Sequence, residues 1–148
     1  MTLRRPESAL VVIYDAASRV LLLQRQDDPE FWQSVTGTLE IDELPMQTAV
    51  REVKEETGIE IDRTGLELVD CRCSNQYQIR GRWRHRYPPE CKTNTEYVFS
   101  LQVTGDEAIV LTEHTDYVWL HKSAAIEKAW SHTNKLAIAQ FVPEVKAN

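Results

Sequence analysis

Three carboxylates stand close together in residues 51–56 (REVKEE). In an α-helix, with about 3.6 residues per turn, Glu52 and Glu56 lie one turn apart on one face and Glu55 lies beside them. Like charges at this spacing repel by roughly 0.2–0.5 kcal/mol per pair, and a bound cation would make the grouping favourable. Because every candidate ligand here is an oxygen atom, Mg²⁺ or Mn²⁺ is favoured over Zn²⁺. The alternative is a solvated surface helix whose acids pair with neighbouring basic residues.

The helix that carries these acids is predicted to run from Pro45 to about Thr57. Proline suits the first helical turn, and glycine, here Gly58, is favoured just past the end. Leu44 stands at the N-cap, where Ser, Thr or Asp would be usual. Beside the acids the helix carries an apolar stripe that can pack on a sheet. The stripe consists of Met46, Ala49, Val50, Val53 and Thr57.

The fixed positions around this helix resemble the Nudix box. They are Gly37, then Glu43 after five residues, then residues 51–59 (REVKEETGI) after seven more. The resemblance implies a loop, helix and loop that hydrolyse a nucleoside diphosphate linked to another group, or a similar pyrophosphate. The residues that it implies as cation ligands are Glu52, Glu55 and Glu56, and those that brace the loop are Glu43 and Arg51.

The implied chemistry agrees with the acids. A pyrophosphate repels an incoming hydroxide, so its hydrolysis needs metal ions that neutralise phosphate oxygens and lower the pKa of the attacking water. One position departs from the family pattern, because many Nudix boxes have glycine just before the first glutamate and this chain has Asp42. Asp tolerates a left-handed backbone better than most residues, so we expect the turn to be preserved.

Apolar runs predict strands on both sides of the central helix. Strands are expected at residues 9–14, 20–25, 66–73, 93–103 and 115–120. The first two are predicted to pair as a hairpin. Two further helices are predicted, one capped by Ser123 and ending near Trp130, and one that starts near Asn134 and covers residues 135–142. These elements indicate an α/β protein with a mixed β-sheet sandwiched between α-helices, as the Nudix resemblance implies, in a single domain over residues 1–148.

Composition limits the possible partners. The net charge of −6 over 148 residues argues against non-specific nucleic-acid binding, which depends on Lys and Arg. Cys71, Cys73 and Cys91 form no C-x-x-C pair and suit a reducing compartment, while a zinc site that they share with His85 is the weaker alternative. The sequence shows no signal peptide or membrane-spanning run. We therefore expect a cytoplasmic protein that needs no membrane and no obligate protein partner.

Segments outside the box extend the resemblance over nearly the whole chain. They are residues 27–37, 85–88, 93–96, 112–114, 130–131 and 137–142. They are similar to the Nudix branch that hydrolyses dihydroneopterin triphosphate to the monophosphate and pyrophosphate in bacterial folate synthesis. This implies a pterin triphosphate as the small-molecule substrate and Mg²⁺, or Mn²⁺, as the cofactor. The alternatives are hydrolysis of another nucleoside triphosphate or a dinucleoside polyphosphate, and a Nudix module that binds a nucleotide without cleaving it.

The same resemblance implies roles for single residues. Glu52 and Glu56 are the expected main metal ligands, Glu55 assists, Glu113 faces them from another loop, and Arg51 completes the catalytic group. Glu55, Glu56 and Glu113 each have the chemistry of a general base, and the sequence does not select one of them. Substrate contacts are expected from Arg4, Arg25, Thr36, Gly37, Tyr77 and Arg80. Arginine suits phosphate because its fork donates two hydrogen bonds.

Residues 80–92 (RGRWRHRYPPECK) form a basic, aromatic-rich segment. On an extended chain its alternating arginines would project to the same side. These are Arg80, Arg82, Arg84 and Arg86. The segment is either a lid that attracts phosphate or a solvated loop.

Overall fold

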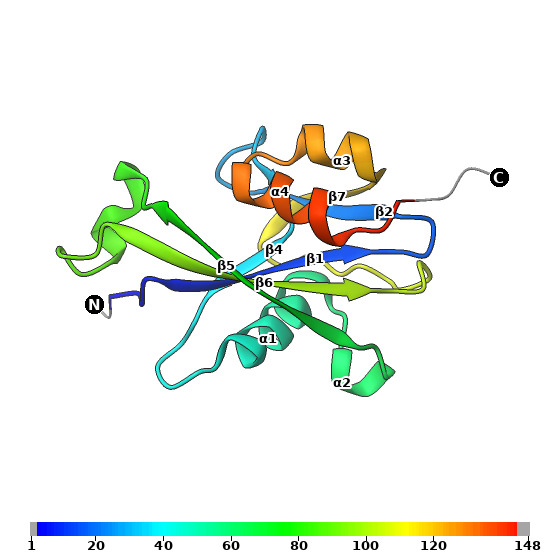
Figure 1. Ribbon diagram of the computed structural model, residues 1–148, viewed down its shortest axis with the longest axis horizontal. Helices are drawn as coiled ribbons and strands as arrows, with labels where there is room; N and C mark the ends of the chain where they lie inside the picture. Colours follow the sequence, from blue (N-terminus) through cyan, green and yellow to red (C-terminus); the bar gives the residue numbers. More distant parts are fainter. Residues whose placement is uncertain (1–2, 145–148) are drawn as a thin grey trace.

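A computed structural model describes residues 3–144, apart from the side chain of Arg82, and shows a mixed β-sheet with helices on both faces (Figure 1). Helices α1 (Pro45–Thr57) and α2 (Ile61–Thr64) lie on one side. Helices α3 (Lys122–Lys128) and α4 (His132–Phe141) lie on the other. The predicted α/β class, with a mixed sheet sandwiched between helices, is confirmed. Within residues 3–144, no helix has the length and apolar character needed to cross a bilayer.

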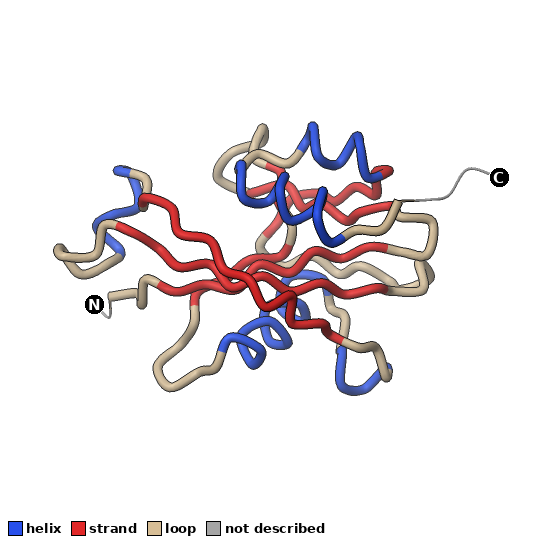
Figure 2. The backbone as a smooth tube through the Cα atoms, viewed as in Figure 1, coloured by secondary structure: helices blue, strands red, loops and turns tan. Residues whose placement is uncertain are grey.

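Strand β1 (Glu7–Tyr14) is the centre of the sheet, and its run from Ala9 to Ile13 is buried throughout. It pairs in parallel with β6 (Thr93–Gln102) and antiparallel with β4 (Val35–Thr38). Strand β5 (Leu68–Gln78) pairs antiparallel with β6 on the outer side, and Figure 2 shows these strands crossing the middle of the molecule. A strand with neighbours on both edges and helices over both faces has no solvated side, which explains its continuous apolar sequence.

Strand β2 (Arg19–Arg25) follows β1 but separates from it after the turn. In the described chain the two strands pair antiparallel at the single pair Tyr14–Val20. The predicted hairpin is therefore confirmed at its turn and does not continue along the strands. The reason is that β4 occupies this edge of β1 over residues 8–11. Strand β2 pairs instead with β7 (His114–His121), which confirms the strand predicted at residues 115–120.

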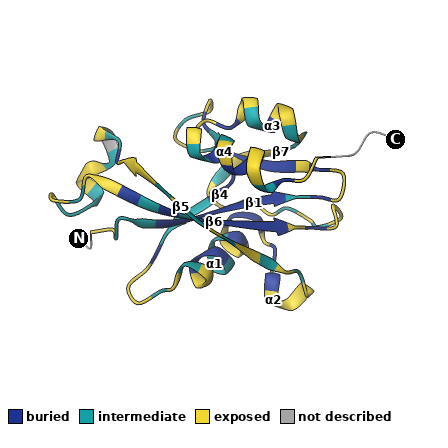
Figure 3. Ribbon diagram, viewed as in Figure 1, coloured by how far each residue is buried: buried dark blue, intermediate teal, exposed yellow. Residues whose placement is uncertain are grey.

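Two apolar clusters fill the spaces between the sheet and its helices, and Figure 3 shows buried residues concentrated on the central strands. From the predicted stripe of α1, Ala49, Val53 and Thr57 are fully buried. Met46 is exposed, which contradicts its predicted place in the stripe, because it lies in the first turn at the loop end of the helix. The packed face of α1 therefore fixes the orientation of the neighbouring acidic face.

The start of α3 differs from the prediction. The helix begins at Lys122, and its N-cap His121 makes no side-chain cap hydrogen bond. The predicted Ser123 cap is therefore wrong. Strand β7 runs to His121 and leads directly into the helix, so no turn residue separates the two elements.

Helix α4 starts earlier than predicted, because Ser131 is its cap and accepts a hydrogen bond from the backbone N–H of Asn134 at 3.1 Å. The Asn134 side chain is buried inside the fold. Its Oδ1 accepts from the Ser34 N–H at 2.8 Å, and its Nδ2 donates to Ser34 Oγ at 2.9 Å. These bonds fasten α4 to the junction between β3 (Trp32–Gln33) and β4.

The basic segment is not extended. Gly81–Arg86 forms a 3₁₀ helix, η1, so the expected alternation of arginine side chains is wrong, and the side chain of Arg82 lies outside the described part of the chain. A 3₁₀ helix has about three residues per turn and cannot place alternate residues on one side. The turn brings Trp83 against Arg80, whose Cζ lies 5.2 Å from the ring centroid.

Candidate active site

Helix α1 occupies Pro45–Thr57, the range predicted from its proline and glycine boundaries. Gly58 adopts a left-handed φ of 81°, and its N–H donates to the Lys54 carbonyl at 2.9 Å. At the other end, Leu44 offers no side-chain acceptor, and Gln47 Oε1 accepts from the Leu44 N–H at 2.8 Å. Both ends are thus fixed, and the acids keep their one-turn spacing.

Glu43 and Arg51 brace the loop before α1. Arg51 Nε donates to Glu43 Oε2 at 2.9 Å, and Nη2 donates to Glu43 Oε1 at 2.8 Å and to the Thr38 carbonyl at 3.1 Å. The hydrogen bonds from Arg51 lower the pKa of Glu43 to about 2. Asp42 has a φ of 63°, so the left-handed turn expected at this position is confirmed. The hydrogen bonds of Arg51 thus hold the loop against β4.

Glu56 is buried, with 3% of its surface exposed, and within the described chain neither carboxylate oxygen has a hydrogen-bond partner. Burial first, and then the acids Glu52 and Glu113, raise the pKa of Glu56 well above its ordinary value. His114 Nε2 lies 3.6 Å from Glu56 Oε1, but burial lowers the pKa of His114 and favours its neutral form. Glu56 therefore lacks a permanent positive partner among the described residues around it.

Glu52 and Glu55 share Arg51. Arg51 Nη1 donates to Glu52 Oε1 at 2.7 Å and to Glu55 Oε2 at 3.3 Å. Burial raises the pKa of Glu52, whereas Glu55 is exposed. Glu52 also packs directly against the backbone of Gly37. One arginine thus orients two of the three acids of α1.

These acids fit a hard divalent cation. All the candidate ligands are carboxylate oxygens, and the buried, unpaired carboxylate of Glu56 is of the kind that a positive charge stabilises most. Within residues 3–144, no three acidic, histidine or cysteine side chains converge closely enough to enclose an ion. The acids therefore form an open wall. An open wall suits Mg²⁺, which commonly combines one or two carboxylates with waters and substrate phosphates.

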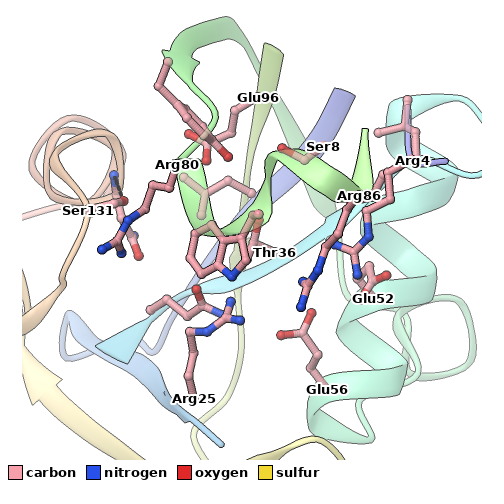
Figure 4. Close-up of a pocket in the computed structure, with 18 of the residues that line it drawn as sticks. Arg4, Ser8, Arg25, Thr36, Glu52, Glu56, Arg80, Arg86, Glu96 and Ser131 are labelled. Atoms are coloured by element: carbon pink, nitrogen blue, oxygen red, sulfur yellow. Dashed lines mark hydrogen bonds between the residues drawn. The ribbon is translucent and has the colours of Figure 1, made fainter. Parts of the chain in front are cut away.

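A pocket of about 1480 Å³ adjoins this wall, and every residue predicted for the site lines it. These residues are Arg4, Arg25, Thr36, Gly37, Arg51, Glu52, Glu55, Glu56, Tyr77, Arg80 and Glu113. Figure 4 shows Glu52 and Glu56 on α1, with Arg4, Arg25 and Arg86 extending toward the same region. Positive groups on three separate segments thus face the acidic helix.

Aromatic rings and arginines alternate along one wall of the pocket. Phe31 and Trp130 stack with ring centroids 4.4 Å apart, and Arg80 Cζ lies 4.4 Å from the Trp130 centroid. Arg25 Cζ lies 5.2 Å from the Phe31 centroid and 5.0 Å from that of Trp83. Because Trp83 belongs to η1, the basic segment forms part of the pocket wall and is not a fully solvated loop.

Sequence reasoning missed several polar residues of the pocket. Among them are Ser8, Glu96, His114 and Ser131. The strand predicted at residues 93–103 contained a usable signal. Asn94 and Glu96 share a two-residue period with buried Val98, and this places both polar side chains on a covered face of the sheet. Buried polar residues at such positions need partners.

Comparison with known proteins agrees with this geometry. Residues 4–141 match the sequence profile of the NUDIX domain. The chain is 49% identical over 142 residues to the dihydroneopterin triphosphate diphosphatase of Escherichia coli (strain K12). The aligned region covers 94% of this chain and 93% of that protein. It is 41% identical over 143 residues to the Haemophilus influenzae protein of the same name, and this alignment covers 96% of this chain and 90% of that protein.

A solved structure shows the same similarity in three dimensions. The E. coli dihydroneopterin triphosphate pyrophosphohydrolase superposes with a TM-score of 0.91 at 47% sequence identity, covering 96% of this chain and 98% of that one. The similarity includes the box and the strands and helices that build the rest of the pocket.

Proposed function

The chain belongs to the Nudix family, and we propose that it hydrolyses dihydroneopterin triphosphate to dihydroneopterin monophosphate and pyrophosphate, a step of folate synthesis. The observation that carries this substrate is the 49% identity over 94% of the chain to the E. coli dihydroneopterin triphosphate diphosphatase. A match of this extent includes the pocket outside the box, where the substrate's ring would lie. The pocket of about 1480 Å³ supports the proposal, because it is large enough for a triphosphate and a ring together.

Nudix hydrolases generally use divalent metal ions, and the ion proposed for this chain is Mg²⁺, which Mn²⁺ can replace. Glu52, Glu55 and Glu56 would hold it from α1, and Glu113 from the loop before β7. When bound, the ion supplies charge neutralisation of phosphate oxygens and a lowered pKa of the attacking water. The unpaired, buried carboxylate of Glu56 supports this assignment.

The reaction breaks the anhydride bond between the α- and β-phosphates. A bond forms between phosphorus and the water oxygen, pyrophosphate leaves, and the water proton passes to a carboxylate. Glu55, Glu56 and Glu113 all line the pocket, and each has the chemistry of a general base. Arg51 orients Glu52 and Glu55 through hydrogen bonds of 2.7 and 3.3 Å.

Six residues are proposed to contact the substrate. They are Arg4, Arg25, Thr36, Gly37, Tyr77 and Arg80, which all line the pocket. Arg25 donates to both carboxylate oxygens of Asp27 at 2.8 Å, so its guanidinium has a fixed orientation before a phosphate binds. An oriented arginine fork recognises phosphate with less loss of side-chain entropy.

Residues 1–148 are further proposed to act as a single domain in the cytoplasm, without a nucleic-acid, membrane or obligate protein partner. The net charge of −6 supports the absence of a nucleic-acid partner. It disfavours binding to a phosphate backbone in the absence of a local cation.

Rates of hydrolysis at equal substrate concentrations test the proposal. The panel contains dihydroneopterin triphosphate, ATP, GTP, 8-oxo-GTP and a diadenosine polyphosphate, each with Mg²⁺. We expect kcat/KM for the pterin to exceed every other value by at least about tenfold, a difference of about 1.4 kcal/mol in transition-state stabilisation. Preference for a nucleotide would overturn the substrate and keep the Nudix chemistry. Tight nucleotide binding without hydrolysis would overturn the enzymatic assignment.

A further inference from the structure

Polar groups from three neighbouring strands gather at the end of the pocket remote from the box. Glu96 on β6 is 4% exposed, and Figure 4 shows it at the opposite end of the pocket from Glu56. Ser8 on β1 stands directly beside Glu96 in the parallel register of the two strands. Tyr77 comes from β5, on the other side of β6. All of these residues line the pocket, and the phosphate chemistry proposed above uses neither Glu96 nor Ser8.

Glu96 has acceptor sites left for a ligand. Its carboxylate accepts a long hydrogen bond of 3.5 Å from Asn75 Nδ2 and also interacts with the Thr133 hydroxyl. Burial raises the pKa of Glu96, because removal from water disfavours the charged form. A carboxylate has about four acceptor sites, so two partners leave part of this buried group unsatisfied, which destabilises the fold. A ligand that brings N–H donors to this position would offset that cost.

The neighbouring hydroxyls of Ser8 and Tyr77 can supply a donor. Asn94 is 2% exposed, and its Nδ2 donates to Ser8 Oγ at 2.8 Å and to Tyr77 Oη at 3.1 Å. In both bonds the hydroxyl oxygen accepts, and because Ser8 and Tyr77 also hydrogen-bond each other, one of their two hydroxyl protons stays available to a ligand. Burial raises the pKa of Tyr77 to about 12, which keeps its hydroxyl protonated at neutral pH. The group therefore presents a carboxylate acceptor beside a hydroxyl donor.

We propose that Ser8 and Glu96 recognise the 2-amino-4-oxo edge of the pterin ring. Glu96 accepts hydrogen bonds from the ring N–H and the exocyclic amino group, which point the same way, and the Ser8 hydroxyl donates to the adjacent carbonyl oxygen. Guanine carries the same edge, whereas adenine and cytosine do not. This assignment rests on the proposed function, because the triphosphate held at α1 directs the ring toward this end of the pocket.

The aromatic wall supports a flat ring in this position. Phe31 and Trp130 stack with an interplanar angle of 16°, and Arg80 lies over Trp130. Planar bases stack on such surfaces with little dependence on their identity. The wall therefore accounts for binding of a ring, and the edge contacts from Glu96 and Ser8 account for which ring binds.

Glu96→Gln tests the edge contact with little change in side-chain size. The carboxamide loses the charge and turns an NH₂ group toward one of the two ring donors. We expect KM for dihydroneopterin triphosphate to rise about 10- to 100-fold with kcat nearly unchanged, the effect of losing hydrogen bonds to a charged group. Glu67→Gln, at an exposed position just before β5, should match the wild type. Ser8→Ala, which removes little volume, should raise KM about 3- to 10-fold.

Binding of the ring alone separates this inference from the proposed function. Neopterin has the ring and no phosphate, and its binding in EDTA can be followed by quenching of tryptophan fluorescence, because Trp83 and Trp130 line the pocket. We expect Glu96→Gln to weaken neopterin binding about 10- to 100-fold, and Glu67→Gln to leave it unchanged. Thermal unfolding of each variant provides the check on folding.

The outcomes separate the two claims. Failure of the wild type to bind neopterin at millimolar concentration, or equal binding by folded wild type and Glu96→Gln, would overturn the ring assignment even where the pterin triphosphate is hydrolysed. Neopterin binding that depends on Glu96, in a protein that does not hydrolyse the triphosphate, would support the ring assignment and overturn the proposed function.

Discussion

Gly37 and Glu52 are packed so closely that a Cβ atom on residue 37 would lie 2.1 Å from Glu52 Cδ and 2.3 Å from its Oε1. Gly37→Ala should therefore displace the Glu52 carboxylate. We expect kcat/KM to fall about 10- to 100-fold, because misplacement of a catalytic group by about 1 Å has effects of this size. Steady-state kinetics measure the loss. Gly81→Ala is the control, since an added Cβ there meets nothing within 4 Å. Equal activity of both variants would contradict the role of this contact.

Glu56→Gln should abolish turnover and stabilise the metal-free protein. Burial raises the pKa of Glu56 in the folded state, so its contribution to stability is complete below the unfolded pKa of about 4.3 and is lost as pH rises through the folded pKa. Glutamine does not ionise and avoids this loss. Urea unfolding in EDTA should therefore show a larger free energy of unfolding for the variant at pH 8 and a smaller difference at pH 4. A difference that is independent of pH, or one shared by the exposed Glu90→Gln, would contradict this explanation.

Mg²⁺ should raise the melting temperature of the wild type and much less that of Glu56→Gln. A ligand at about 100 times its Kd stabilises the folded state by about 2.7 kcal/mol. The shift should reverse with EDTA, and scanning calorimetry measures it. Equal shifts in the two proteins would exclude Glu56 as a metal ligand.

Glu43→Gln should destabilise the protein by about 1–3 kcal/mol at pH 7, because two charge-assisted hydrogen bonds from Arg51, of 2.8 and 2.9 Å, lose their charge. The pKa of Glu43 is lowered to about 2 in the folded state. Its stabilising effect is therefore complete above the unfolded pKa of about 4.3 and is lost as pH falls through about 2. Urea unfolding should show a smaller difference in free energy of unfolding between the wild type and Glu43→Gln at pH 3 than at pH 7. Glu40→Gln is the control, because Glu40 is exposed and lies 3.8 Å from Arg51.

Local rules predicted the acidic helix because its boundaries depend on adjacent residues. Pro45 and Gly58 marked the ends of α1, and the packing stripe fixed which side faces solvent. The same reasoning anticipated the left-handed turn at Asp42. The central strands were predictable for a similar reason, since residues 9–13 and 98–101 are buried and are apolar apart from Ser100.

Non-local pairing was not predictable in this way. The apolar run of β2 is as compatible with β1 as with β7, and β4 decides the outcome by occupying the edge of β1. The 3₁₀ turn at residues 81–86 places Trp83 against Arg80, its neighbour in the chain, and against Arg25 of the distant strand β2, and the local sequence does not reveal the second contact. Glu96 was missed because its value as a pocket residue depends on Ser8, which lies far from it in sequence and beside it in the sheet.

Phosphorus NMR of the reaction mixture identifies the products of dihydroneopterin triphosphate hydrolysis with Mg²⁺ and so tests the proposed reaction. We expect one pyrophosphate and one dihydroneopterin monophosphate per substrate consumed, no orthophosphate, and no reaction with folded Glu56→Gln. Stepwise release of orthophosphate, an unchanged substrate, or normal turnover by Glu56→Gln would contradict it.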